Sequence, residues 1–160
     1  MRFGVARDIA YSIQNVIPDL YITGSLRRKE EEIKDLDFIT RRPITAIVDE
    51  MVNMGATVKN KGPRYASFSI DFLPTGNDIQ TVNVDIWYAK NDYDYLFKKT
   101  MRNMDKNHYI GLMMKANKNG YHLSENGLKD NNGRYIHCRT KADIIRTINK
   151  PLYDIDCIVI

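Results

Sequence analysis

The sequence contains few cysteines and no long apolar run. The two cysteines, Cys138 and Cys157, have no histidine or further cysteine at the spacing of a zinc site, so we expect neither zinc nor a disulfide framework. No apolar stretch approaches the roughly 18 residues that a membrane-spanning helix needs. The N-terminus also lacks the apolar core of a signal peptide. These absences predict a soluble intracellular protein of the cytoplasm or nucleus, with no membrane partner.

Negative charge is scarce in the C-terminal half. The whole chain has a formal net charge of +4, but residues 98–150 contain 12 Lys and Arg against 4 Asp and Glu, so the remainder is net acidic. One interpretation is simply a well-solvated basic lobe. The other is a lobe that binds polyphosphate, joined to a lobe that holds cations.

Hydrophobic periodicity predicts an α+β fold in which a mixed sheet is covered by helices. The expected helices cover residues 3–17, 43–55, 92–120 (as one or two helices) and 142–148. The expected strands cover residues 20–24, 36–40, 65–73, 79–89, 121–124 and 135–138, with a hairpin turn at 75–78. The change of pattern near residue 91 divides the chain into a sheet lobe, residues 1–90, and a smaller basic α+β lobe, residues 91–160.

Three aspartates lie on the polar sides of two predicted strands. Residues two apart on a strand point the same way, so Asp35 and Asp37 share one face, while Leu36 points into the core. Asp85 lies on the polar face of the strand at 79–89. If these strands are neighbours, the three carboxylates form one patch, and a cation among them would relieve their repulsion. Two Mg²⁺ ions in such a patch favour displacement at phosphorus. Solvated aspartates without a ligand are the alternative interpretation.

A Gly-Ser turn precedes the aspartate pair by ten residues. Gly24 permits a tight turn at the end of a strand, and Ser25 with the amides that follow it can meet a phosphate. Arg27 and Arg28 add positive charge, and an arginine fork can bind a phosphate through two nitrogens. The segment therefore indicates a site for a triphosphate.

The order Gly24-Ser25-x-Arg27-Arg28, then Asp35-x-Asp37, then Asp85 resembles the family X DNA polymerases, which are polymerase beta-like nucleotidyltransferases. The segment LKDNNGRYI at 128–136 and a helix that starts after Thr140 resemble the C-terminal subdomain of that family. The resemblance extends from about residue 18 to Pro151. It implies a nucleotidyltransferase palm over residues 1–90 and a small nucleotide-selecting subdomain of the fingers or thumb type over residues 91–160.

The resemblance also implies residue roles. Asp35 and Asp37 would bind both Mg²⁺ ions, for which Mn²⁺ is an expected substitute. Asp85 would bind the catalytic ion and help to take the proton from the primer 3′-hydroxyl. The nucleotide-binding residues would be Gly24, Ser25 and Arg28, whereas Arg27 is expected to be structural or to contact the DNA backbone.

The sequence departs from the family in two places. It has no clear copy of the Tyr-Phe-Thr-Gly turn that contacts the nucleotide sugar, and Met113 lies near the place of an arginine that probes the template minor groove. No lyase or helix-hairpin-helix region is expected in 160 residues. The resemblance is therefore closest to the minimal viral members, and a viral replication site is one expected location.

Without those regions, the basic lobe is expected to bind DNA phosphates in a sequence-independent, salt-sensitive way. The expected contacts are Lys98, Lys99, Arg102, Lys106, Lys115 and Lys118. The expected function is the filling of short gaps in primed or gapped DNA with dNTPs, in DNA repair. The protein is expected to act as a monomer. Two alternatives remain open. One is a template-independent nucleotidyltransferase acting on RNA, a small molecule or a protein, and the other is a catalytically silent DNA-binding module.

Overall fold

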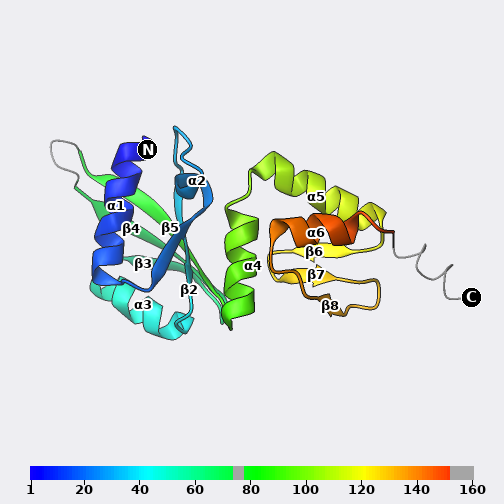
Figure 1. Cartoon of the computed structure of the whole chain (residues 1–160). Helices are drawn as coiled ribbons and strands as arrows, with labels where there is room; N and C mark the ends of the chain where they lie inside the picture. Colours follow the sequence, from blue (N-terminus) through cyan, green and yellow to red (C-terminus); the bar gives the residue numbers. More distant parts are fainter. Residues whose placement is uncertain (74–77, 152–160) are drawn as a thin grey trace, which may run out of the picture. The chain divides into compact units, whose positions relative to one another are not determined.

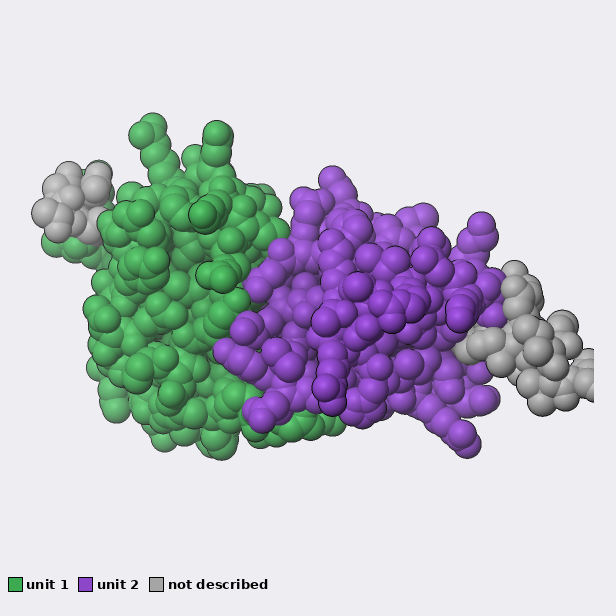
Figure 2. Space-filling view, in the orientation of Figure 1, with its two compact units in different colours: residues 1–91 green, residues 92–160 purple. Residues whose placement is uncertain are grey.

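The computed structural model describes residues 1–73 and 78–151. The chain forms two compact units, unit 1 over residues 1–91 and unit 2 from residue 92 onward (Figure 2). Cys157 and most of the hairpin turn predicted at 75–78 lie outside the described residues. Within the described ranges, no helix has both the length and the apolar character that crossing a membrane requires.

Unit 1 is a mixed five-stranded sheet with three helices (Figure 1). The sheet order is β1-β2-β5-β4-β3, in which β2 and β5 are parallel and the other neighbours are antiparallel. The strands are β1 Leu20–Thr23, β2 Asp35–Thr40, β3 Thr57–Lys61, β4 Tyr65–Phe72 and β5 Gln80–Tyr88. The helices are α1 Phe3–Val16, α2 Gly24–Arg27 and α3 Ile44–Asn53. This arrangement confirms the predicted α+β class.

Strand β3 was not expected from the sequence. All five of its residues are exposed, and they show no apolar alternation because β3 is an edge strand that pairs only with β4. Strand β5 and the first four residues of β2 alternate as predicted. Leu36, Phe38, Val84 and Ile86 are fully buried in one core with the apolar residues of α1 and α3, which leaves the polar side chains of β2 and β5 on the opposite face.

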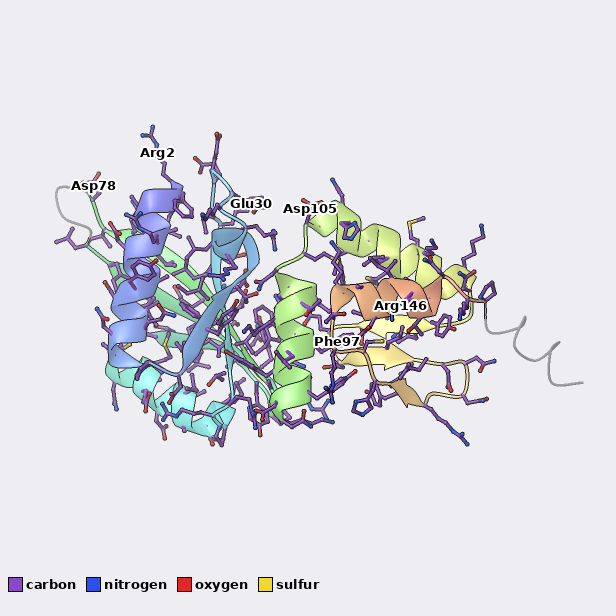
Figure 3. All side chains as sticks on the ribbon, viewed as in Figure 1. Arg2, Glu30, Asp78, Phe97, Asp105 and Arg146 are labelled. Carbon is purple, nitrogen blue, oxygen red and sulfur yellow. The ribbon has the colours of Figure 1, made fainter. Side chains whose placement is uncertain are left out.

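Unit 2 combines three helices with a small antiparallel sheet (Figure 1). Its elements are α4 Asp92–Arg102, α5 Lys106–Lys118, β6 His122–Ser124, β7 Gly127–Lys129, β8 Tyr135–Ile136 and α6 Lys141–Ile148. Phe97, labelled on α4 in Figure 3, packs in a second core with Met101, Leu123 and Ile144. The short strand β7 was missed, because three residues are too few to show a period.

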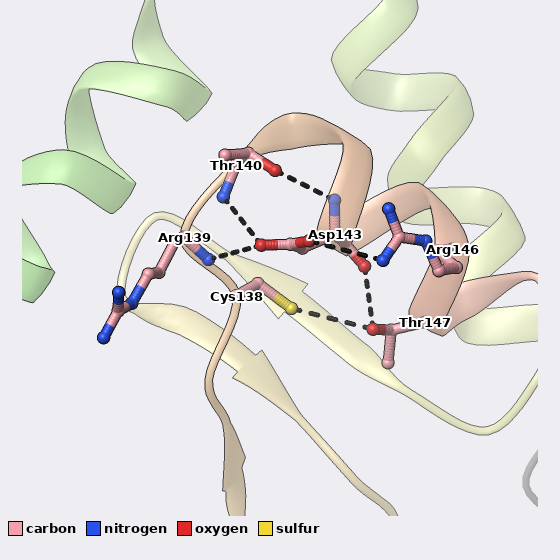
Figure 4. Close-up of polar contacts among 6 residues, drawn as sticks. All are labelled: Cys138, Arg139, Thr140, Asp143, Arg146 and Thr147. Atoms are coloured by element: carbon pink, nitrogen blue, oxygen red, sulfur yellow. Dashed lines mark hydrogen bonds and ion pairs between the residues drawn. The ribbon is translucent and has the colours of Figure 1, made fainter.

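Side-chain caps define where α5 and α6 begin. The Asp105 carboxylate accepts hydrogen bonds from the backbone N–H groups of Asn107 and His108 (Figure 3 labels Asp105). At α6, Thr140 Oγ1 accepts from the Asp143 N–H at 3.1 Å, and Asp143 Oδ2 accepts from the Thr140 N–H at 3.3 Å (Figure 4). The backbone N–H of Arg139 and this capping box lower the pKa of the Asp143 carboxyl. The predicted helix after Thr140 is thus confirmed, and the capping box explains why it begins there.

Lys98 is buried in unit 2. Its side chain, in a residue only 3% exposed, places Nζ 2.7 Å from Asp94 Oδ1 and 3.3 Å from Asn126 Oδ1. These contacts tie α4 to the turn between β6 and β7. They correct the expectation that Lys98 contacts DNA, because the ammonium is already enclosed by its partners and has almost no surface to offer a phosphate.

Lys98→Met is expected to lower the free energy of unfolding by roughly 3–5 kcal/mol, because the substitution leaves the buried Asp94 carboxylate without its ammonium. Urea unfolding of both proteins measures the difference. The double variant Asp94→Leu/Lys98→Met should recover much of the loss, since both charges are then replaced by apolar side chains. A loss in the single variant below about 1 kcal/mol, the size expected for an exposed pair, would contradict this role.

Candidate active site

The three predicted aspartates lie on neighbouring strands. In the parallel pairing of β2 with β5, Asp37 is the register partner of Asp85, and Asp35 is the partner of Asn83. All three aspartates are partly buried on the polar face of the sheet. The two strands are neighbours, which was the condition for a shared patch, so the backbone places Asp37 beside Asp85 and Asp35 on the same face of β2.

A row of polar residues crosses the sheet at this level. Thr23, Asp37, Asp85 and Ser67 are successive register partners on β1, β2, β5 and β4. The flanking residues are buried, with Thr23 0% and Ser67 5% exposed. The two aspartates therefore lie side by side between two hydroxyl side chains, where less water reaches them than on an open strand surface.

Gly24 lies directly against Asp37. The glycine follows β1 and opens α2 with a φ of +70°, and a Cβ added there would overlap the Asp37 carboxylate, 2.9 Å from Cγ. Only glycine combines this backbone angle with so close an approach. The same turn carries Ser25, which is partly exposed, next to the aspartates. The predicted phosphate-binding segment and the predicted metal ligands are therefore adjacent in space.

The two arginines that follow differ in their surroundings. Arg28 is partly buried, and its Nε lies 3.4 Å from Glu30 Oε1 in the loop after α2 (Figure 3 labels Glu30). Arg27 is exposed, with its guanidinium carbon 5.7 Å from the centroid of the Tyr21 ring. Glu30, the first residue of an acidic run at 30–32, is thus a partner of Arg28.

Tyr65 is a site residue that the sequence did not reveal. Its hydroxyl donates a hydrogen bond to Asp85 Oδ1 at 2.7 Å, and its ring centroid lies 5.1 Å from that of Trp87. Tyr65 and Trp87 are register partners on β4 and β5. The alternation of β4 places Tyr65 on the polar face, but only the pairing register shows that it reaches Asp85.

The three carboxylates have the chemistry of a magnesium site, but the structure does not place all three close enough together to bind one ion. Asp35, Asp37 and Asp85 offer only oxygen atoms, which Mg²⁺ prefers. The side-chain carboxylate of Asp35 accepts no hydrogen bond from any residue that the structure describes, although its backbone lies in the β2–β5 pairing. Within residues 1–73 and 78–151, however, no three acidic, histidine or cysteine side chains lie close enough to hold an ion. The two Mg²⁺ ions stay a prediction, supported by the strand register.

The basic residues predicted to bind DNA fall into two groups. Lys106, Lys115 and Lys118 are exposed on α5, and the last two are three residues apart and so share a face. Arg102 donates to Glu125 Oε1 at 2.7 Å with its side chain only 15% exposed, and Lys99 Nζ lies 5.1 Å from the Tyr95 ring. The α5 lysines are therefore the members of the set best placed to meet a phosphate.

No model of a known protein family and no curated protein matches this sequence. Among solved structures, the chain is similar to the polymerase beta of Leishmania infantum in a ternary P/T complex, with a TM-score of 0.70 and 15% sequence identity. The match covers 94% of this chain and 73% of that chain. The chain therefore has a polymerase beta-like fold. At this identity the likeness shows the fold alone.

In Gly24→Ala, backbone strain is expected to lower the free energy of unfolding by about 1–3 kcal/mol. The overlap of the added Cβ with the Asp37 carboxylate is expected to cause a further loss. Thermal unfolding measures the change. Gly133→Ala is the matched control, because Gly133 has a similar φ of +78° but an added Cβ there meets nothing within 4 Å. Equal losses in the two variants would contradict a specific close approach between Gly24 and Asp37.

Proposed function

We propose that this protein is a DNA-directed nucleotidyltransferase that fills short gaps by adding a dNTP to a primer 3′-hydroxyl. The observation that carries the proposal is the pairing of Asp37 with Asp85 on parallel strands, with Gly24 against Asp37. The polymerase beta-like fold supports it, and so does the order of the Gly-Ser turn and the aspartates, which resembles that of family X. Gap filling in DNA repair, as in family X, is the proposed setting.

Asp35, Asp37 and Asp85 are the proposed ligands of two Mg²⁺ ions, with Mn²⁺ as a substitute. When bound, such ions neutralise charge on the transferred phosphoryl group and favour ionisation of the attacking hydroxyl. The aspartates themselves repel one another when no cation is near, because they are partly buried and adjacent. Metal binding would therefore also stabilise the folded site.

Other side chains are proposed to accept the proton and to bind the triphosphate. Tyr65 holds Oδ1 of Asp85 by a hydrogen bond, and no described residue donates to Oδ2, which can accept the proton of the primer hydroxyl. The Ser25 hydroxyl and the Arg28 guanidinium are proposed to bind the triphosphate. The Arg28–Glu30 contact of 3.4 Å is long for a charged hydrogen bond, so a phosphate can compete with it.

The proposed DNA contacts are the exposed lysines of α5, namely Lys106, Lys115 and Lys118. They would bind the phosphate backbone without regard to sequence, and the affinity should fall steeply with salt. A template-independent transferase is the second candidate, favoured by the missing Tyr-Phe-Thr-Gly turn and by Met113 in place of an arginine.

The proposal is tested by Mg²⁺-dependent extension of a labelled primer on a duplex with a single-nucleotide gap, with each dNTP supplied alone. We expect addition of only the complementary nucleotide, and a loss of more than about 100-fold in Asp85→Asn, because the variant removes a charge at the reacting centre. Asp71→Asn is the matched control. Asp71 lies on β4 on the same face as Asp85 but four register pairs away, and its carboxylate accepts a hydrogen bond from Thr81 Oγ1.

Addition of any nucleotide regardless of the template base would replace this proposal with a terminal-transferase activity. No addition by folded wild-type protein would overturn DNA synthesis and direct the test to RNA, small-molecule or protein acceptors. Equal activity in Asp85→Asn and wild type would overturn the role of the aspartates.

Tyr65→Phe is expected to lower the extension rate by roughly tenfold, because partners that orient a metal ligand typically contribute 10–100-fold. DNA affinity should not change, since Tyr65 contacts Asp85 rather than DNA. Single-turnover kinetics and DNA binding, measured separately, distinguish the two effects. In the Asp85→Asn background, Tyr65→Phe should cause no further loss, and a full additional tenfold loss there would contradict the positioning role.

A further inference from the structure

Unit 1 contains a cavity that none of the candidate catalytic or nucleotide-binding residues lines. Its volume is about 270 Å³, and it lies between α1, β1 and the segment of α2 with the residues that follow. The lining residues that matter here are Phe3, Arg7, Tyr11, Tyr21, Arg27 and Lys29. Three cations and three aromatic rings therefore surround one cavity.

The positive charge of the cavity is largely uncompensated. Arg27 and Lys29 form no ion pair with any described residue, and Arg7 meets only the adjacent Asp8, at 3.3 Å. No aspartate or glutamate lines the cavity. In the nearby loop, the Glu30 carboxylate pairs with Arg28 and the Glu32 carboxylate with the N-terminal ammonium. An anion in the cavity would gain three favourable partners.

Two of the arginines lie over aromatic rings. The Arg27 guanidinium carbon lies 5.7 Å from the Tyr21 centroid, and that of Arg7 lies 6.0 Å from the Phe3 centroid. A stacked guanidinium keeps its N–H donors at the edge of the plane, where they can bind a phosphate. Tyr11 is 52% exposed, so its ring is accessible to a ligand.

The walls of the cavity are held by backbone contacts. Gln14 Nε2 donates to the Leu20 carbonyl at 2.8 Å and fixes α1 against β1. The Lys29 N–H donates to the Leu26 carbonyl, and Lys29 has a φ of +59°. This angle is unfavourable for a residue with a side chain, and Lys29 is the only non-glycine residue with positive φ in the described part of the chain.

We propose that this cavity binds one nucleotide unit, with the base stacked on the aromatic rings and the phosphate on Arg7, Arg27 and Lys29. Cationic side chains interleaved with aromatic rings are how proteins bind single-stranded nucleic acid. The volume lies at the lower end of ligand pockets, which suits a single unit and not a duplex. A single strand of nucleic acid or a free mononucleotide can supply this unit. The inference does not require nucleotidyl transfer.

The test is fluorescence anisotropy of a short labelled oligothymidylate with the full chain, without Mg²⁺ or dNTP. Arg27→Gln/Lys29→Asn is the first variant, with Asn chosen because it tolerates positive φ. We expect about a tenfold loss of affinity and a shallower dependence on salt, since two phosphate partners are removed. Lys61→Gln/Arg64→Gln removes the same charge from exposed residues outside the cavity and should bind nearly as well as wild type.

Stacking is tested at Tyr11. Tyr11→Ala should lower affinity by about fivefold or more, whereas Tyr11→Phe should bind like wild type because it keeps the ring. Displacement of the oligonucleotide by thymidine monophosphate at similar concentration would identify a free nucleotide as the source, and failure to displace it would identify the strand. Equal losses in the cavity and control variants, or no loss in either cavity variant, would overturn the proposal.

These outcomes are independent of the gap-filling assay. A duplex with a single-nucleotide gap and no overhang presents only one unpaired template nucleotide, which pairs with the incoming dNTP during extension. Lost catalysis with intact oligonucleotide binding would therefore contradict only the proposed function, and intact catalysis with no effect of the cavity variants would contradict only this inference.

Discussion

The parallel pairing of β2 with β5 is the constraint on which the candidate active site depends. Leu36 and Phe38 pair in register with Val84 and Ile86, and all four are fully buried. A slip of one residue would turn these side chains toward the polar face and the aspartates into the core. Because such a slip is so unfavourable, the core on one face fixes the positions of Asp37 and Asp85 on the other.

This arrangement places groups that repel one another where solvent is limited. Adjacent carboxylates between the buried Thr23 and Ser67 are not favoured for stability alone, so the hydrophobic face of the sheet must offset the repulsion. Gly24 removes a steric conflict with Asp37, and Tyr65 satisfies one oxygen of Asp85. These features fit the cation site proposed above.

One short segment contributes residues to two different sites. In the run from Gly24 to Lys29, Gly24 and Arg28 lie toward the aspartates and Glu30, whereas Arg27 and Lys29 line the cationic and aromatic cavity. The alternation follows from the single turn of α2, in which consecutive residues point in different directions. Two positive charges that look equivalent in the sequence, those of Arg27 and Arg28, are therefore proposed to bind different phosphates.

The sequence by itself determined the α+β class, the strands that carry the aspartates and the start of the last helix, because these depend on local periodicity and capping. It could not separate buried Lys98 from exposed Lys115, since charge counts do not report burial. It also missed β3, β7 and the contact of Tyr65 with Asp85. Only the tertiary structure decided these, because strand order and register join residues that are far apart in the chain, and no local pattern encodes which strands become neighbours.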